Sequence, residues 1–246
     1  MMGNLKAIVL AAGKGTRLAT EGIDLPKVMR LALGKPLLGY VLDEISFIDR
    51  DDIAVVVGYK REAVEAGFPE YHFAIQDEQL GTGHAVMCAK DFLDGYDGDV
   101  LVCYGDMPLL SRETYTALAK VHADEGADCT ILTGTTDLEL PYGRIVRDEN
   151  GGFVKVVEDR DSTPEQKNID ELNIGVYVFK ARKLVESLSE LRTDNAQGEY
   201  YLTDVPTIIM KHGGKISLCK RSLGSELIGI NTVEQLNMAE EYLKNK

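Results

Sequence analysis

The feature that most constrains the fold is the alternation of short β-branched runs with amphipathic segments in the first half of the chain. Five apolar runs have the length of buried strands: Lys6–Leu10, Ile53–Val57, Phe73–Ile75, Val100–Tyr104 and Cys129–Leu132. Between them lie segments of helical periodicity, at about Leu37–Ile48, Arg61–Ala66, Gly83–Phe92 and Arg112–Asp124. This alternation predicts an α/β fold with a Rossmann-like, mostly parallel sheet flanked by helices. Ligands of such sheets bind where the strands end at their carboxyl edge.

The second half of the chain has a different pattern and predicts a β-rich addition to the sheet. Strands at Arg144–Arg147 and Phe153–Val157 flank an Asn-Gly-Gly turn, which is typical of a hairpin. Further expected elements are strands at Leu172–Phe179 and Ile216–Cys219, helices at Arg182–Leu191 and Asp204–Lys211, and a last helix opened by the capping box Thr232 to Gln235. No Pro/Gly/Ser-rich linker separates the halves, so one domain is expected over residues 1–246.

Charge and composition exclude several classes of protein. The formal net charge is −13, whereas nucleic acids need a basic face, so no nucleic-acid partner is expected. No apolar run approaches the roughly 20 residues of a membrane span, and Ala7–Ala12 is too short for a signal peptide. A cytoplasmic protein without membrane contact is therefore expected. The cysteines are interpreted as reduced core residues, because no C-x-x-C pair occurs among Cys88, Cys103, Cys129 and Cys219.

A glycine-rich loop, Leu-Ala-Ala-Gly-Lys-Gly-Thr-Arg-Leu, follows the first predicted strand. Its glycines let the backbone approach a phosphate and donate N–H groups to the oxygens. Leu18 stands where the dinucleotide motif G-x-G-x-x-G needs its third glycine, and the loop does not match the phosphate-binding G-x-x-x-x-G-K-[ST] motif either. Three nearby cations, Lys14, Arg17 and Lys27, favour anion binding over a plain strand-to-helix turn.

Gln-Asp-Glu-Gln-Leu-Gly-Thr-Gly-His-Ala, after the third strand, is a candidate base-binding segment. The amide of Gln76 offers one acceptor and two donors to the edge of a nucleobase. Gly81 and Gly83 would let the backbone lie flat against such a base. The structural alternative is a helix entry capped by Thr82, and His84 is interpreted as a structural histidine.

Two further polar motifs complete the set. Asp106 follows an apolar strand in Tyr-Gly-Asp-x-Pro, where a Mg²⁺ ligand is expected, although a plain turn has the same composition. Asn231, at the entrance of the last helix, is the candidate for a second oxygen ligand. Residues 194–204, Asp-Asn-Ala-Gln-Gly-Glu-Tyr-Tyr-Leu-Thr-Asp, concentrate amides, carboxylates and tyrosines, with a polar linker that ends in a helix cap as the alternative.

In this order, the motifs resemble one family: the N-acetylglucosamine-1-phosphate uridylyltransferase domain of bacterial peptidoglycan precursor synthesis. The resemblance runs from about Lys6 to Asn231. The glycine loop with Leu-Pro-Lys at 25–27 is shared by sugar nucleotidyltransferases in general, and the other motifs are more specific to this family. The resemblance implies a nucleotide-diphospho-sugar transferase fold, with a nucleotide-binding half at about 1–135, a β-rich sugar-binding half at about 136–231 and a C-terminal helix at 232–246.

The resemblance also implies a role for each matching residue. Uridine would be held by Leu10, Ala11, Ala12, Gly13, Gln76, Gly81 and Thr82. Arg17 and Lys27 would neutralise the triphosphate and the departing pyrophosphate, as the catalytic cations. Asp106 and Asn231 would hold Mg²⁺. The sugar side would be lined by Tyr104, Gly143, Glu158, Asn173 and Thr203, and Asn231 would contact substrate as well as the metal. The implied reaction takes UTP and a sugar-1-phosphate to a nucleotide sugar, UDP-N-acetylglucosamine, and pyrophosphate.

Two departures from the family leave alternatives open. The resembling bacterial enzymes continue into a β-helix of hexapeptide repeats with acetyltransferase activity, whereas this sequence ends at Lys246, so neither acetyl transfer nor the trimer that the β-helix organises is expected. Pro141 replaces a glycine beside the sugar side, which leaves the sugar open. The alternatives are a related enzyme with another sugar or triphosphate, and a non-catalytic sensor of nucleotide sugars. Nothing in the sequence determines the oligomeric state.

Overall fold

The computed structural model describes residues 4–15, 18, 24–136 and 140–245. Within these residues the main sheet has nine strands, and its central path runs β11-β7-β10-β6-β1-β4-β5. The bounds of these strands are β1 Leu5–Leu10, β4 Ile53–Val57, β5 His72–Ile75, β6 Asp99–Tyr104, β7 Cys129–Thr135, β10 Leu172–Lys180 and β11 Ile216–Ser222. Neighbouring strands are parallel except where β10 runs antiparallel to β6 and β7. The predicted α/β fold with a mostly parallel sheet is confirmed.

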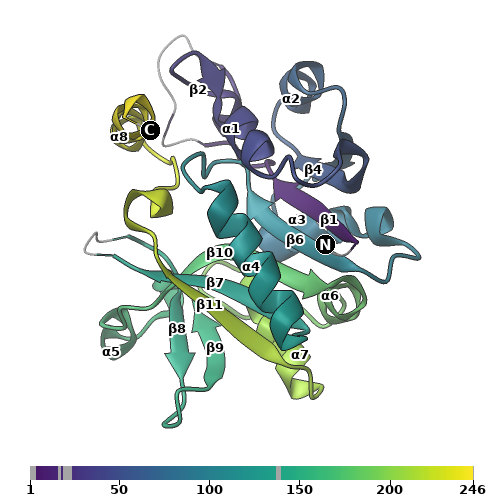
Figure 1. Cartoon of the computed structure of the whole chain (residues 1–246), viewed down its shortest axis with the longest axis vertical. Coiled ribbons are helices and arrows are strands. Elements are labelled where there is room, and N and C mark those ends of the chain that lie inside the picture. Colours follow the sequence, from purple (N-terminus) through teal and green to yellow (C-terminus); the bar gives the residue numbers. More distant parts are fainter. Residues whose placement is uncertain (1–3, 16–17, 19–23, 137–139, 246) are drawn as a thin grey trace.

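Helices cover both faces of the sheet (Figure 1), as the alternation of strands and helices predicted. One face is covered by α1 (Leu37–Glu44), α2 (Arg61–Gly67) and α4 (Arg112–Glu125), and the other by α3 (Thr82–Cys88), α6 (Ala181–Leu188) and α7 (Val205–Lys211). Successive side chains of β1 enter opposite cores, because strand residues alternate between the two faces. Ala7 and Val9 join the first core, and Ile8 and Leu10 the second.

A hairpin of β8 (Arg144–Arg147) and β9 (Phe153–Val157) lies beside β10 and supplies the predicted β-rich addition. Asp148 holds its turn by accepting the N–H groups of Asn150 and Gly152 at 2.9 and 2.8 Å. The short helix α5 (Pro164–Lys167) follows β9.

The last helix, α8 (Val233–Lys244), packs beside a small hairpin of β2 (Leu31–Ala32) and β3 (Lys35–Pro36), as Figure 1 shows. The predicted capping box is present: Thr232 accepts from the N–H of Gln235, whose side chain accepts from the N–H of Thr232. Leu236 and Ala239 pack in a third small core with Leu37, Leu109 and Ile230. No described helix is long and apolar enough to cross a membrane.

Several predicted helices end earlier than expected. Within the expected range Leu37–Ile48, α1 ends at Glu44, and the expected helix at Gly83–Phe92 divides into α3 and a 3-10 turn at Lys90–Leu93. Ile45 and Ile48 are nevertheless buried in the core. Apolar periodicity therefore continues past the end of a helix wherever a following turn packs on the same core, and the sequence pattern does not mark the boundary.

Candidate functional site

Two adjoining pockets lie at the carboxyl ends of β1 and β6. The first encloses about 730 Å³ of empty space and the second about 550 Å³, including the solvent space at their open mouths. Tyr104, the last residue of β6, and Asp106, two residues later, line both pockets. Ligands in the two pockets would therefore meet beside these two side chains.

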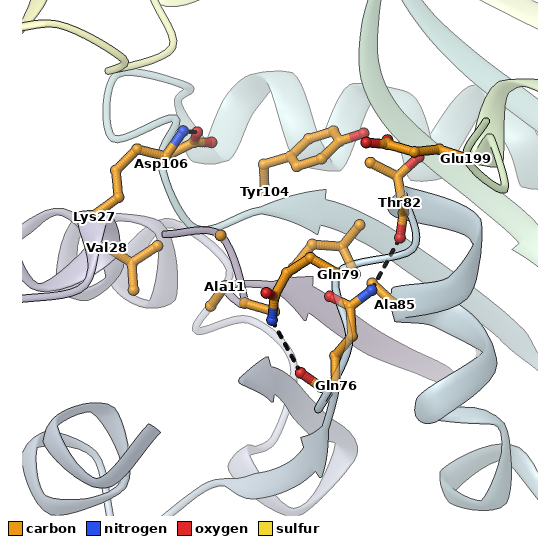
Figure 2. Close-up of a pocket in the computed structure, with 14 residues that line it drawn as sticks. Ala11, Lys27, Val28, Gln76, Gln79, Thr82, Ala85, Tyr104, Asp106 and Glu199 are labelled. Carbon is orange, nitrogen blue, oxygen red and sulfur yellow. Dashed lines mark hydrogen bonds and ion pairs between the residues drawn. The ribbon is translucent and has the colours of Figure 1, made fainter. Parts of the chain in front are cut away.

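The first pocket, drawn in Figure 2, collects the residues predicted for the nucleotide. Leu10 to Gly13 reach it from the end of β1, Gln76 and Gly81 from the segment between β5 and α3, and Thr82 from the first position of α3. Lys27 lines its far end, next to Asp106. Lys14 is exposed and does not line the pocket, and Arg17 lies outside the described residues. Further lining residues that the sequence argument did not select are Val28, Gln79, Ala85 and Glu199.

The backbone after β1 supplies unpaired donors. The N–H of Ala11 donates to the carbonyl of Val56 at 2.8 Å, in the manner of a sheet residue. The N–H groups of Ala12 and Gly13, in contrast, donate to no group of the described residues. Because unpaired backbone donors at a pocket wall favour an oxygen-rich ligand, this turn has the chemistry expected of a phosphate- or carbonyl-binding segment.

The wall opposite β1 consists of two motifs that are far apart in sequence. The N–H of Tyr200 donates to the carbonyl of Leu80, and the N–H of Gly83 to the carbonyl of Tyr200, each at 2.8 Å. The hydroxyl of Thr82 accepts from the N–H of Leu202 at 3.1 Å. The capping role considered for Thr82 is therefore wrong: α3 begins at Thr82 itself, and its hydroxyl joins the two motifs instead.

Lys27, Asp106 and Asn231 form a charged cluster at the junction of the pockets. The ammonium of Lys27 pairs with the carboxylate of Asp106 and donates to Oδ1 of Asn231 at 2.9 Å. The side chains of Lys27 and Asp106 are only 14% and 16% exposed, so water screens this pair weakly. Two oxygens, one anionic, thus already converge on a single cation.

This donor set fits Mg²⁺, which binds protein through one or two oxygen ligands and takes the rest from water and substrate phosphates. Among the described residues, no cluster of three or more His, Cys, Asp or Glu side chains could hold a metal by itself. A divalent ion here would therefore depend on Asp106, Asn231 and the substrate together.

Backbone contacts hold Asn231 in place. Its N–H donates to the side chain of Gln235 at 2.7 Å, which extends the capping box of α8 to the site. Its Nδ2 donates to the carbonyl of Gly229 at 3.3 Å, which leaves Oδ1 facing Lys27. The N–H of Ile230 donates to the carbonyl of Asp106 at 2.9 Å. The start of α8 and the end of β6 are thus connected directly.

Tyr142 attaches this segment to the second pocket. Its hydroxyl donates to the carbonyl of Leu227 at 2.6 Å and accepts from the N–H of Gly229 at 3.1 Å. Burial raises the pKa of Tyr142 well above its ordinary value, so the hydroxyl keeps its proton. In the sequence Tyr142 stands between Pro141 and Gly143, but only the folded chain shows that it anchors the segment that carries Asn231.

We expect Tyr142→Phe to lower the free energy of unfolding by about 1 kcal/mol, since two hydrogen bonds of a buried hydroxyl are lost. Affinity for Mg²⁺ in the presence of nucleotide should fall several-fold, because Gly229 and Asn231 lose their anchor. Chemical denaturation and titration with Mn²⁺ measure the two effects. Tyr96→Phe is the matched control: its hydroxyl donates to the carbonyl of Asp99, away from both pockets, so only stability should change. Unchanged metal affinity in Tyr142→Phe would contradict the anchoring role.

The second pocket collects the residues predicted for the sugar: Tyr104, Gly143, Glu158, Asn173 and Thr203 all line it, and Asn231, the predicted metal ligand, lines it as well. Thr203 donates its hydroxyl proton to Oε1 of Glu158 at 2.9 Å, which orients the carboxylate. Pro141, the residue that departs from the family pattern, also lines this pocket.

Asn173 is more constrained than the sequence suggested. Its Nδ2 donates to the hydroxyl of Tyr177 at 2.8 Å, and its Oδ1 accepts from the N–H of Gly175 at 3.2 Å. Gly175 has φ of +79°, and a Cβ there would overlap the ring of Tyr104. One amide proton of Asn173 therefore remains for a ligand, and the missing Cβ of Gly175 leaves room for the ring of Tyr104, which lines both pockets.

Burial and acidic neighbours perturb Glu158. Desolvation raises the pKa of Glu158, the hydrogen bond from Thr203 lowers it, and the nearby Asp161, Asp204 and Asp159 raise it further. The net direction is upward. Burial has removed water that would otherwise donate hydrogen bonds to the carboxylate of Glu158. Hydroxyl or amide groups of a ligand can replace these donors.

The comparisons with known proteins agree with this geometry. Residues 6–224 match the family model described as "Nucleotidyl transferase". The chain is 42% identical to a protein named "Bifunctional protein GlmU" from Clostridium novyi (strain NT), over 97% of this chain and 52% of that protein. It is 43% identical to the protein of the same name from Lactococcus lactis subsp. lactis (strain IL1403), over 99% of this chain and 53% of the relative. The chain thus spans about half the length of these relatives. With its family model covering most of its length, the chain belongs to the nucleotidyl transferase family.

Proposed function

We propose that the protein transfers UMP from UTP to N-acetylglucosamine-1-phosphate and releases UDP-N-acetylglucosamine and pyrophosphate. The observation that carries the proposal is the meeting of two pockets at Tyr104 and Asp106, with Lys27 at the junction. A nucleotide in the first pocket and a sugar phosphate in the second would place their phosphates side by side at this charged cluster. The family supports nucleotidyl transfer, and so do the relatives of which this chain spans about half. The choice of UTP and of the sugar is the finer part of the proposal.

The reaction needs no nucleophile from the protein. An oxygen of the sugar phosphate attacks the α-phosphorus of UTP in line, a new P–O bond forms, and the bond to pyrophosphate breaks. The residues contribute by positioning both substrates and neutralising charge. Lys27, and Arg17 by resemblance, would bind the departing pyrophosphate.

The oxygens of Asp106 and Asn231 would hold Mg²⁺ at the junction. When bound, this ion neutralises and orients the phosphates of the triphosphate. In the described structure the same oxygens contact the ammonium of Lys27. A metal held by these oxygens would therefore compete with Lys27 for them, and the triphosphate would offer Lys27 another anionic partner. This exchange also explains how a chain of net charge −13 can bind two anions.

On the sugar side, Glu158 and the free amide proton of Asn173 would bind the N-acetylhexosamine. The carboxylate would accept hydrogen bonds from sugar hydroxyls or from the N-acetyl N–H, and the amide proton of Asn173 would donate to a ligand oxygen.

The proposed function is tested by measuring pyrophosphate release with a panel of triphosphates and sugar phosphates in the presence of Mg²⁺. We expect turnover with UTP and N-acetylglucosamine-1-phosphate at a rate well above that of glucose-1-phosphate, and little with dTTP or CTP. Turnover with another pair would favour the related-enzyme alternative. Calorimetric binding of UDP-N-acetylglucosamine without turnover of any pair would favour the sensor and overturn the proposal.

Glu158→Gln is expected to separate stability from activity. The folded state raises the pKa of Glu158 above its unfolded value, so the ionised carboxylate destabilises the fold at pH 7. The substitution should therefore raise the free energy of unfolding at pH 7 by about 1 kcal/mol. This gain should vanish as the pH falls through the folded pKa toward 4, because the wild-type acid then becomes neutral as well.

The same variant should lose at least about tenfold in kcat/KM for the sugar phosphate, because a charged acceptor becomes a neutral amide. Denaturation curves at pH 7 and 4 and initial rates measure the two effects. Glu165→Gln, on the exposed helix α5, is the control and should change neither quantity appreciably. Equal activity of Glu158→Gln and wild type would remove Glu158 from the sugar site.

A further inference from the structure

A hydrogen-bonded network lies behind the first pocket, at the end away from Lys27. Gln76 directly follows β5 and is 3% exposed. Its Nε2 lies 3.1 Å from the carbonyl oxygen of Gly81 and 3.1 Å from Nδ1 of His84. A carbonyl oxygen only accepts hydrogen bonds, so the atom of the Gln76 amide that faces Gly81 must be its nitrogen. The orientation of this amide is therefore determined by its surroundings.

The protonation of His84 follows from the same contacts. One proton of the Gln76 amide goes to Gly81, and the second points to Nδ1 of His84, which must therefore be the unprotonated, accepting nitrogen. The imidazole proton then sits on Nε2, which faces Sγ of Cys88 at 3.9 Å. The network runs in one direction, from Gln76 to His84 to Cys88, and His84 is neutral in it.

Both donor positions of the Gln76 amide are thus occupied, and only its oxygen is left. No described residue donates a hydrogen bond to Oε1. Figure 2 shows the amide nitrogen turned toward Gly81 and the oxygen turned away from it, on the side of the pocket that Ala11 and Gln79 also line. A nearly buried acceptor without a partner favours a ligand that brings a donor to it.

We propose that His84 is a positioning residue for base selection: it holds Gln76 so that only an acceptor faces the base. The inference rests on the proposed binding of a nucleotide in this pocket. Uracil and thymine carry an N–H at position 3 that donates to such an acceptor, whereas cytosine presents a lone pair there. This one contact would thus favour pyrimidines with an N3 proton over cytosine, because an amide oxygen and the N3 lone pair repel each other.

Without His84, the side-chain amide of Gln76 would rotate more easily. In the wild type two hydrogen bonds oppose a rotation of the amide that would bring its nitrogen to the base. Only the bond to Gly81 would then remain. A turned amide donates to N3 of cytosine. Loss of His84 is therefore expected to weaken the use of UTP and to relax the discrimination against CTP, while the distant charged cluster and the sugar pocket are unaffected.

The test compares His84→Leu with His84→Asn, two side chains of nearly equal size and shape. The amide oxygen of asparagine can take the place of Nδ1 and accept from Gln76, whereas leucine offers no acceptor. We expect the ratio of kcat/KM for UTP to that for CTP to exceed about 100 in the wild type and to fall at least about tenfold in His84→Leu. His84→Asn should keep the ratio within about threefold of the wild type, and KM for the sugar phosphate should not change in either variant.

Thermal unfolding of both variants establishes that they are folded, and His84→Ala replaces His84→Leu if leucine prevents folding. A wild-type protein that does not prefer UTP to CTP would overturn the proposed function itself. A wild type that prefers UTP, together with a folded His84→Leu of unchanged preference, would overturn only the role of His84. Equal loss of selectivity in His84→Leu and His84→Asn would also overturn it, because the accepting atom would then be irrelevant.

Discussion

Asp106→Asn is expected to lower Mg²⁺-dependent turnover by about three orders of magnitude while the protein stays folded. The carboxylate is the only anionic oxygen in its cluster with Lys27 and Asn231, and the amide that replaces it binds a divalent cation weakly. The backbone contact that Asp106 makes, its carbonyl accepting from Ile230, does not involve the side chain and should persist. Initial rates of pyrophosphate release against Mg²⁺ concentration measure the loss.

Two further measurements make this prediction specific. Binding of Mn²⁺ in the presence of nucleotide should weaken in parallel with activity, and circular dichroism should show an unchanged fold. Asp94→Asn is the matched control, because Asp94 is exposed and lies before β6 rather than after it; its activity should equal that of the wild type. Full activity of Asp106→Asn would remove Asp106 from the metal site and leave the junction of the pockets without its proposed function.

Gly81→Ala is expected to have the largest effect on structure. Gly81 has φ of +110°, and a Cβ there would lie 2.6 Å from the carbonyl oxygen of Tyr200 and 2.9 Å from Cβ of Glu199. Those atoms belong to backbone and to the base of a side chain, so they cannot turn away. The substitution should therefore separate the two motifs that form the pocket wall and lower the free energy of unfolding by about 3 kcal/mol, the sum of backbone strain and overpacking.

Gly126→Ala separates these two causes. Gly126 ends α4 with φ of +59°, and a Cβ there would have no heavy atom within 4 Å. It should lose only about 1 kcal/mol, from the left-handed backbone, and nucleotide affinity should not change. Urea denaturation and calorimetric titration with nucleotide compare the two variants. An equal loss of stability in both variants would show that overlap with Tyr200 adds nothing to the effect of Gly81→Ala.

Sequence patterns were enough to predict the kind of fold and to select most residues of the candidate site. Alternating apolar runs and helical periodicity predicted every strand of the central sheet, since burial of both sheet faces leaves a strong local signal. The residues that the resemblance assigned to uridine, metal and sugar line one of the two pockets, whereas Lys14 does not. Those of the first pocket mostly follow β1, β5 and β6, because the carboxyl ends of parallel strands share one edge of the sheet. Helix ends were less predictable, as Ile45 and Ile48 show, because apolar periodicity continues into packed turns.

Which side chains contact one another is visible only in the folded chain. The contacts of Lys27 with Asp106 and Asn231 join residues up to 204 positions apart, and the anchor from Tyr142 to Leu227 spans 85. A local pattern carries no signal for such pairs, since their distance depends on how whole elements pack. His84 is the clearest case: its sequence context indicated a structural histidine, and the fold showed which nitrogen accepts and from which amide.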